Sequence, residues 1–367
     1  MGIGLEGGLA PYVDRGSFEL PELRLWSMMK QTIEECGYRP GEDVAIALDP
    51  ALSELEIAYR EEFDVPDSIG MYLFWRDHSK KVMDRDAVLA VYKKAILEYD
   101  IPILSIEDGF SEDDYEGWHK LLDKLGDRIL VIGDDLVTTN DRTIEMAANK
   151  GLINSVLVKA NQIGSLYETL LAVLVTLGKG LEVVVSHRSK SPNDDMEAHI
   201  ALATNALGIK AGGGANTERL VKYQAVTTQM ERVVEATVKE PELPEFATVE
   251  RLRAREEPTN AGIPTVGVDL RLALPGANPD SRVRMSFHGA TPLGTSSGTG
   301  EAVHLVDNVF ERAEYLEAVE RHPELVNEVE PGVFAFDKKV TRTQVESTGD
   351  KALLALFKRT LRYEGKG

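Results

Sequence analysis

Five short blocks between Ser105 and Lys210 decide the fold of this chain. They read S-I-E-D-G-F (105–110), V-I-G-D-D-L-V-T-T-N (131–140), V-L-V-K-A-N-Q-I-G (156–164), V-V-V-S-H-R-S (183–189) and G-I-K-A-G-G-G (208–214). Each block is an apolar run that ends abruptly in polar residues, as expected of a strand that is covered on both faces. Segments with helical periodicity, about 20 to 25 residues per repeat, separate the blocks. We therefore expect parallel strands joined by crossover helices, which is an α/β fold.

The polar residues that follow these strands should gather on one rim of the sheet. An earlier strand, V-A-I-A-L-D (44–49), ends in the same way. In a (β/α)₈ barrel the carboxyl ends of the strands carry the chemistry. The residues at this rim are Asp49, Glu107, Asp134, Lys159, His187, Arg188 and Lys210. Carboxylates, lysines and a His-Arg pair at successive strand ends are hard to explain by packing, and they favour an active site.

Composition excludes several classes of function. The 367 residues include 41 basic and 61 acidic side chains, and the net charge of −20 argues against a general nucleic-acid binder. No apolar segment approaches the ~20 residues of a membrane-spanning helix, and the first residues lack the layout of a signal peptide. A single cysteine, Cys36, excludes an internal disulfide and fits a reducing compartment. We expect a cytoplasmic protein that binds neither nucleic acid nor membranes.

The pattern of apolar and polar residues changes after the repeat of strands and helices. Residues 1–239 read as the barrel domain, and residues 240–248 (E-P-E-L-P-E-F-A-T) read as an acidic, proline-containing linker. Residues 249–367 begin with runs that alternate apolar and polar side chains, which indicates antiparallel strands with one wet face. Two helices, roughly 300–321 and 341–362, should follow. We expect a smaller α+β capping domain.

Taken together, the blocks of the first domain resemble the C-terminal barrel of enolase. S-I-E-D, G-D-D-L-V-T-T-N, K-A-N-Q-I-G, S-H-R-S, and I-K-A-G followed by E-R-L-V-K occur in the family's order. The resemblance implies a TIM-type barrel with Mg²⁺ bound by Asp49, Glu107 and Asp134. Three carboxylates that converge on one point repel one another unless a hard divalent cation lies between them.

The resemblance also implies catalytic roles. Lys159 falls on the general base, whose pKa nearby cations would lower. Lys210 would hold the substrate carboxylate and its dianionic form, with Glu107 also facing the substrate. Glu6, in G-L-E-G-G, falls on the glutamate that helps a β-hydroxyl leave. The residues that resemble the family's phosphate side are His187, Arg188 and Ser189.

The second domain resembles the family's N-terminal domain. A-R-E-E-P-T-N-A-G-I-P-T-V-G-V-D-L (254–270) matches its opening, and T-P-L-G-T-S-S-G-T-G-E-A (291–302) aligns with its mobile loop. This alignment implies that Ser296 binds a second Mg²⁺. The order of the domains then indicates a circular permutation.

Several features depart from the family pattern. Leu5 stands where an acidic residue is usual, and Ala261 stands where an arginine is usual. We recognise only six barrel strands and find no counterpart of the G-S-H-A-G loop with its histidine. Three explanations compete: a different chain supplies the missing strands, residues near 332–340 fill the gap, or the chain is a degenerate copy.

Three functions follow from these observations. The leading hypothesis is a Mg²⁺-dependent lyase that converts 2-phosphoglycerate, or a close analogue, into phosphoenolpyruvate, the glycolytic enolase reaction. A second is an enolase-like enzyme of phosphonate metabolism, of the carboxyphosphonoenolpyruvate synthase type. A third is a non-catalytic subunit of a heteromeric complex. The expected partner is a small phosphorylated or phosphonate carboxylic acid, and the family resemblance implies a homo-oligomer.

Overall fold

The computed structural model describes residues 2–76, 79–236, 247–261, 263–275, 282–292, 309–311, 320–330, 333–337, 340–354 and 357. The chain divides into two compact units. One holds the described residues of 2–189 and 195–236, and the other holds 190–194 and the described residues from 247 onward. Ser296 and most of the predicted linker 240–248 lie outside the described residues. Most of the predicted helix 300–321 does so too, but its described residues Val309–Glu311 form a strand, so the prediction is wrong there.

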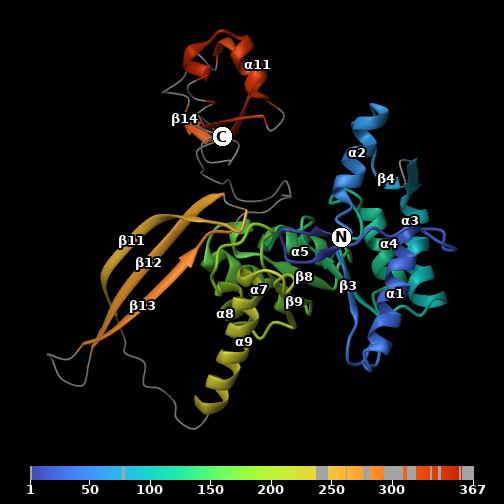
Figure 1. The fold of residues 1–367 in the computed structure, drawn as a ribbon, viewed down its shortest axis with the longest axis horizontal. Coiled ribbons are helices and arrows are strands. Elements are labelled where there is room, and N and C mark those ends of the chain that lie inside the picture. Colours follow the sequence, from blue (N-terminus) through green and yellow to red (C-terminus); the bar gives the residue numbers. More distant parts are fainter. Residues whose placement is uncertain are drawn as a thin grey trace. The chain divides into compact units, whose positions relative to one another are not determined.

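Six parallel strands form the main sheet of the first unit (Figure 1). Their order across the sheet is β10-β9-β8-β7-β6-β3, and every neighbouring pair is parallel. The strands are β3 (Ile46–Leu48), β6 (Ile103–Glu107), β7 (Leu130–Gly133), β8 (Ser155–Val158), β9 (Glu182–Ser186) and β10 (Gly208–Lys210). The six predicted strands and the α/β class are therefore confirmed. Within the described residues the sheet is open, with β3 and β10 at its two edges.

Helices alternate with these strands. They are α1 (Pro21–Glu35), α2 (Ser53–Phe63), α3 (Arg85–Lys93) with a π-helical turn (Lys94–Glu98), α4 (Tyr115–Leu125), α5 (Asp141–Asn149), α6 (Ala160–Ile163), α7 (Leu166–Gly178), α8 (Met196–Ala203) and α9 (Thr217–Ala236). Three polar side chains that lie at or shortly after the ends of the sequence blocks cap the helices that follow. Asp114, Asn140 and Ser165 accept backbone N–H groups at the N-termini of α4, α5 and α7. The blocks thus end a strand and start the next helix within a few residues.

The hydrophobic core lies between the sheet and these helices. Strand residues such as Ile106, Val131 and Val156 are fully buried there together with Trp118 and Leu121 of α4. Burial of one such aliphatic side chain contributes about 1.5–3 kcal/mol. The continuous apolar runs of the sequence are therefore explained by contact with the helices, and this contact holds the strand ends in place.

Two short antiparallel ribbons complete the first unit. β1 (Gly2–Ile3) pairs with β2 (Leu9–Ala10), and β4 (Met71–Arg76) pairs with β5 (Ser79–Asp84). The second ribbon is a hairpin. The first ribbon presents the turn that contains Glu6.

The second unit contains antiparallel sheets, as the alternating sequence predicts. β11 (Thr248–Pro258), β12 (Pro264–Pro275) and β13 (Arg282–Ala290) form one sheet, and β14 (Val309–Glu311), β16 (Val333–Phe336) and β15 (Val326–Glu330) form another. A 3₁₀ turn (Pro323–Leu325) precedes β15, and α11 (Arg342–Ser347) falls within the predicted helix 341–362. Because β16 pairs with β14 on one side and β15 on the other, the idea that residues near 332–340 fill the gap in the barrel is wrong.

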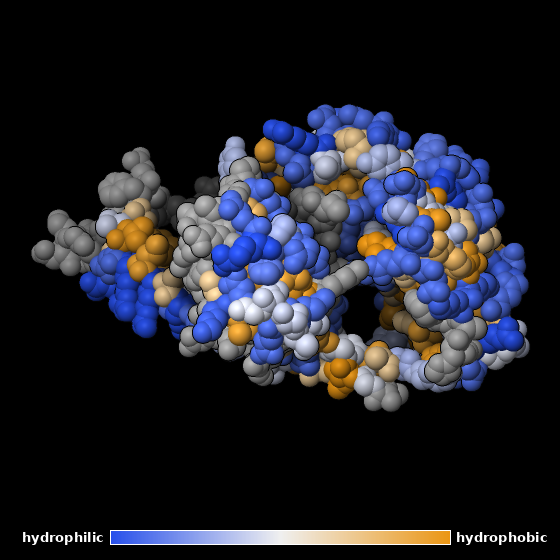
Figure 2. Space-filling view, turned by 90° about the horizontal axis from the view of Figure 1, so that it is seen from above, coloured by the Kyte–Doolittle hydropathy of each residue, from blue (hydrophilic) through white to orange (hydrophobic). Residues whose placement is uncertain are grey.

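The face shown in Figure 2 is largely hydrophilic, in keeping with the net charge of −20. Among the described residues, no helix combines the length and the apolar character needed to cross a bilayer.

Candidate active site

A pocket of about 200 Å³ lies where the six strands end. It is smaller than the ~300–1,000 Å³ of drug-sized ligand sites, so it suits a small molecule. Ala51 is the one apolar residue among those that line it. The others are Glu6, Asp49, Asp108, Asp134, Asp135, Lys159, Ser186, His187, Arg188, Ser189 and Lys210. Apart from Ser296, the predicted site residues are therefore brought together, with Glu107 joined to the pocket through Lys210.

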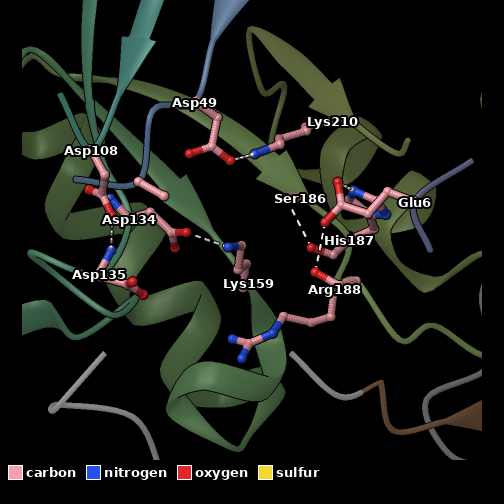
Figure 3. A pocket seen from close by; sticks show the side chains of 12 residues that line it. Glu6, Asp49, Asp108, Asp134, Asp135, Lys159, Ser186, His187, Arg188 and Lys210 are labelled. Carbon is pink, nitrogen blue, oxygen red and sulfur yellow. Dashed lines mark hydrogen bonds and ion pairs between the residues drawn. The ribbon is translucent and has the colours of Figure 1, made fainter. Parts of the chain in front are cut away.

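Two lysines contact the carboxylates of the pocket (Figure 3). Lys159 Nζ donates to Asp134 Oδ2. Lys210 Nζ lies 2.7 Å from Asp49 Oδ2 and 2.7 Å from Glu107 Oε1, and so forms a bridge between them. Glu107 is only 4% exposed, whereas Asp49 lies nearer to solvent.

Burial sets the protonation of this cluster. Burial is the main reason that the pKa of Glu107 is raised to about 8. The charges of Asp49 and Asp134 act in the same direction, whereas Lys210 acts against them. Burial alone would lower the pKa of Lys159, but the charges of Asp134 and Glu107 have the larger effect. The pKa of Lys159 is therefore raised. The sequence predicted a lowered pKa for Lys159. Lys210 does act in that direction, but the carboxylates have the larger effect, so a neutral Lys159 requires that their charge be neutralised.

A layer of hydrogen bonds fixes Asp134 and Lys159. Gln162 Nε2 donates to Asp134 Oδ1 at 2.9 Å, and Thr139 Oγ1 donates to Gln162 Oε1 at 2.7 Å. Thr139 Oγ1 also accepts the backbone N–H of Lys159 at 2.9 Å. Because its oxygen is occupied by Thr139, the Gln162 amide can only present its NH₂ group to Asp134.

Asp108, which also lines the pocket, supports the same region. Its two carboxylate oxygens accept the backbone N–H groups of Asp134 and Asp135, each at 2.9 Å. It is buried, and its φ of +42° is uncommon for a residue with a side chain. Asp108, Asp135, Thr139 and Gln162 all lie within the quoted sequence blocks, but no sequence pattern assigned them a role.

The opposite side of the pocket is formed by Glu6 and the residues after β9. Ser189 Oγ donates to Glu6 Oε1 at 2.7 Å, and His187 Nε2 lies 3.6 Å from Glu6 Oε2. His187 holds the pKa of Glu6 well below its usual range; burial opposes this and Ser189 reinforces it. Glu6 is therefore ionised in the free protein.

Glycines make this approach of two distant segments possible. Glu6 O accepts the backbone N–H of Gly213 at 2.7 Å. A Cβ on Gly213 would lie 2.2 Å from Gly7 O, and a Cβ on Gly7, whose φ is +73°, would lie 2.5 Å from Gly213 O. Gly7 of G-L-E-G-G and Gly213 of K-A-G-G-G are thus explained by direct backbone contact between the two loops.

The carboxylates fit a hard divalent cation. One oxygen from each of Asp108, Asp134 and Asp135 lies within 4.8 Å of the others, and Asp49 and Glu107 both contact Lys210. Mg²⁺ prefers such oxygen ligands. Both oxygens of Asp108 accept backbone N–H groups, and those of Asp134 accept Gln162 and Lys159, so an ion bound to Asp134 would compete with Lys159 for its carboxylate.

The comparison with known families agrees with this geometry. Residues 1–240 match the family model described as "Enolase, C-terminal TIM barrel domain". The matched region spans more than half of the chain and contains the six-stranded sheet and all the residues of the pocket. The chain therefore belongs to the enolase family through this barrel domain.

Proposed function

We propose that the protein is a Mg²⁺-dependent lyase of the enolase type, acting on 2-phosphoglycerate or a close analogue. The observation that carries the proposal is that Lys159 and Lys210 meet buried carboxylates on one side of a small pocket, while Glu6 and His187 lie on the other. A base near one end of a short acid and a carboxyl group near the other can remove HX across two adjacent carbons.

In the proposed reaction, Lys159 Nζ takes the proton alpha to the substrate carboxylate. The electrons of the C–H bond form the C=C bond, and the β-hydroxyl leaves as water after it receives a proton from Glu6. Lys210 Nζ pairs with the substrate carboxylate as its negative charge grows. Bound Mg²⁺, held by Asp49, Glu107 and Asp134, would stabilise that charge and neutralise the carboxylates around Lys159. A second ion on Ser296 stays a prediction.

The ionisation of Glu6 needs a separate argument, because an ionised carboxylate cannot act as an acid. A substrate with a carboxylate and a phosphate brings several negative charges beside Glu6, and like charges disfavour ionisation. We propose that Glu6 becomes protonated when substrate binds. Arg188, which lines the pocket after β9, would bind the phosphate with a bidentate guanidinium.

Leu5 favours a second candidate, the enolase-like enzyme of phosphonate metabolism. Its side chain is 42% exposed and apolar, next to the proposed acid, where the family resemblance implies a carboxylate. Such a change leaves Lys159 and the carboxylate cluster intact and alters the side where the leaving group departs. The two candidates thus share the base and differ in the substrate.

We further propose that a partner chain completes the barrel. A TIM barrel has eight strands, and the described sheet has six, with open edges at β3 and β10. Leu104, within β6, is 54% exposed although its neighbours Ile103 and Ser105 are buried. A circular permutation and a homo-oligomer remain proposals that rest on the family resemblance.

The test combines turnover with mass measurement. Purified chain, Mg²⁺ and 2-phosphoglycerate are mixed while the ultraviolet absorbance of the enol product is followed, and native mass spectrometry reports the assembly on the same sample. Turnover by the chain alone supports the lyase and removes the need for a partner. Turnover only in a complex with a second polypeptide supports the split barrel. Absence of turnover in both samples, with the phosphonate analogue also inert, contradicts the proposal and favours a non-catalytic subunit.

A further inference from the structure

Arg219 of α9 is fully buried beside the pocket, and its contacts are unusual for a buried cation. Nη1 donates to His187 Nδ1 and, at 2.9 Å, to Arg188 O. Nη2 donates to Leu5 O at 3.0 Å and to Ser189 O at 2.6 Å. Nε lies 3.4 Å from a carboxylate oxygen, Glu218 Oε1. Burying a charge mainly against neutral acceptors is costly, which favours a positional role over a stabilising one.

The contact with His187 determines where the imidazole proton resides. A guanidinium has donors and no acceptor, so His187 Nδ1 must accept and can carry no proton. A neutral ring then carries its proton on Nε2, which is the nitrogen 3.6 Å from Glu6 Oε2. The ring cannot readily turn away, because it is only 2% exposed.

We propose that Arg219 is a positioning residue that keeps His187 neutral, with its proton on Nε2 aimed at Glu6. The same guanidinium holds the carbonyl of Leu5 and the carbonyl of Ser189, so it also fixes the spacing between the turn of Glu6 and the loop of His187. One side chain thereby sets both the direction of the donor and the place of its acceptor. The effect of Arg219 on catalysis rests on the proposed lyase reaction, whereas its effect on the protonation of His187 does not.

The charges around His187 are consistent with this role. Glu6 from the N-terminal turn, Arg219 from α9 and Lys210 from β10 face the ring. Burial lowers the pKa of His187, Glu6 opposes the effect, and Arg219 and then Lys210 add to it. Without Arg219, the ring would face Glu6 on one side and have an open proton position on Nδ1, so it should bind a second proton more readily.

The test reads the imidazole nitrogens directly by ¹⁵N NMR at about pH 6, half a unit below the ordinary histidine pKa of about 6.5. The His187→Gln variant identifies the signals of His187 among the seven histidines. In the wild-type protein we expect a neutral ring with Nε2 protonated. In Arg219→Met we expect a predominantly charged ring with both nitrogens protonated.

Lys222→Met is the matched control. Lys222 is a fully buried cation on the same helix, three residues along, but it pairs with Glu197 Oε2 at 2.8 Å. We expect this variant to leave the His187 signals unchanged. If Arg219→Met does not fold, Arg219→Gln, which keeps an N–H donor and loses the charge, should raise the charged fraction of His187.

Three results would overturn the proposal: an Nδ1-protonated or charged ring in the wild type, an unchanged neutral ring in the folded Arg219 variant, or an equal change in Lys222→Met. Because no substrate is present, this measurement succeeds or fails independently of the lyase activity. Loss of turnover in Arg219→Met would then connect the proton position to the reaction.

Discussion

Lys210 Nζ lies 2.7 Å from Asp49 Oδ2, although these residues end the strands at opposite edges of the six-stranded sheet. The same nitrogen lies 2.7 Å from Glu107 Oε1 on the neighbouring β6. Residues 161 positions apart in the chain therefore form an ion pair. The sheet curves enough to bring side chains from its two edges to one site, although the sheet is open within the described residues.

We predict that Mg²⁺ binding releases a proton from Glu107. Its pKa is raised to about 8, so at pH 7 the free protein holds the protonated form, whereas a cation requires the carboxylate. Affinity should therefore rise with pH, by about tenfold per unit below pH 8, and level off above it.

Calorimetry in two buffers of different ionisation enthalpy counts the protons released when Mg²⁺ binds. Glu107→Gln should weaken binding and remove the release, and Asp49→Asn should weaken binding while the release persists. A wild-type affinity for Mg²⁺ that does not change with pH would contradict the predicted proton release.

We predict that Lys159→Met lowers turnover by about a thousandfold, within the range of a lost general base. The side chain is largely buried against Asp134, so circular dichroism should be recorded to show that the fold is kept. Lys179→Met is the matched control, because Lys179 forms a partly exposed pair with Glu145 at 2.8 Å. Near-normal turnover by the Lys159 variant would show that another group removes the proton.

We predict that Glu6→Gln separates the two halves of the reaction. The variant should lose turnover by about a hundredfold or more, since the leaving hydroxyl no longer receives a proton. Exchange of the substrate's alpha proton with solvent should continue, since Lys159 is untouched. Exchange is measured by NMR in heavy water, with Glu168→Gln on the surface of α7 as the control. Equal loss of exchange and turnover would mean that Glu6 does not act on the leaving group.

We predict that Gly213→Ala is far more harmful to turnover than Gly214→Ala. A Cβ on Gly213 meets the backbone of Gly7 at 2.2 Å, whereas one on Gly214 meets only Leu220 Cδ2 at 3.7 Å. The first change must displace the turn that carries Glu6, and a shift of about 1 Å in an active site lowers rates by about a hundredfold. Melting temperatures recorded alongside show whether the loss reflects the site or the fold. Equal turnover in the two variants would contradict the proposed contact between the loops.

The strands and the rim were predictable from the sequence because each is encoded locally. An apolar run followed at once by Asp134, Lys159 or Lys210 specifies both a buried strand and the side chain at its end. The supporting residues were not predictable in this way. Thr139, Gln162 and Asp108 act through hydrogen bonds to groups that are 23 to 28 positions away in the chain, and such partners are defined only after the chain folds.

Arg219 illustrates the same limit more strongly. It lies on a helix 32 positions from His187 and 214 from Leu5, and nothing in E-R-L-V-K indicates which loops its guanidinium joins. The raised pKa of Lys159 was also missed, because it depends on the distances to Asp134 and Glu107 and not on residue types alone.

The proposal that Lys159 removes the alpha proton of the substrate is tested most directly by alpha-proton exchange in the wild-type chain and in Lys159→Met. Each is incubated in heavy water with Mg²⁺ and 2-phosphoglycerate, and deuterium at the alpha carbon is followed by NMR. The account predicts exchange by the wild type that requires Mg²⁺ and is abolished in the Lys159 variant. Equal exchange by both proteins, or none by a wild type shown to bind Mg²⁺ and substrate, would contradict it.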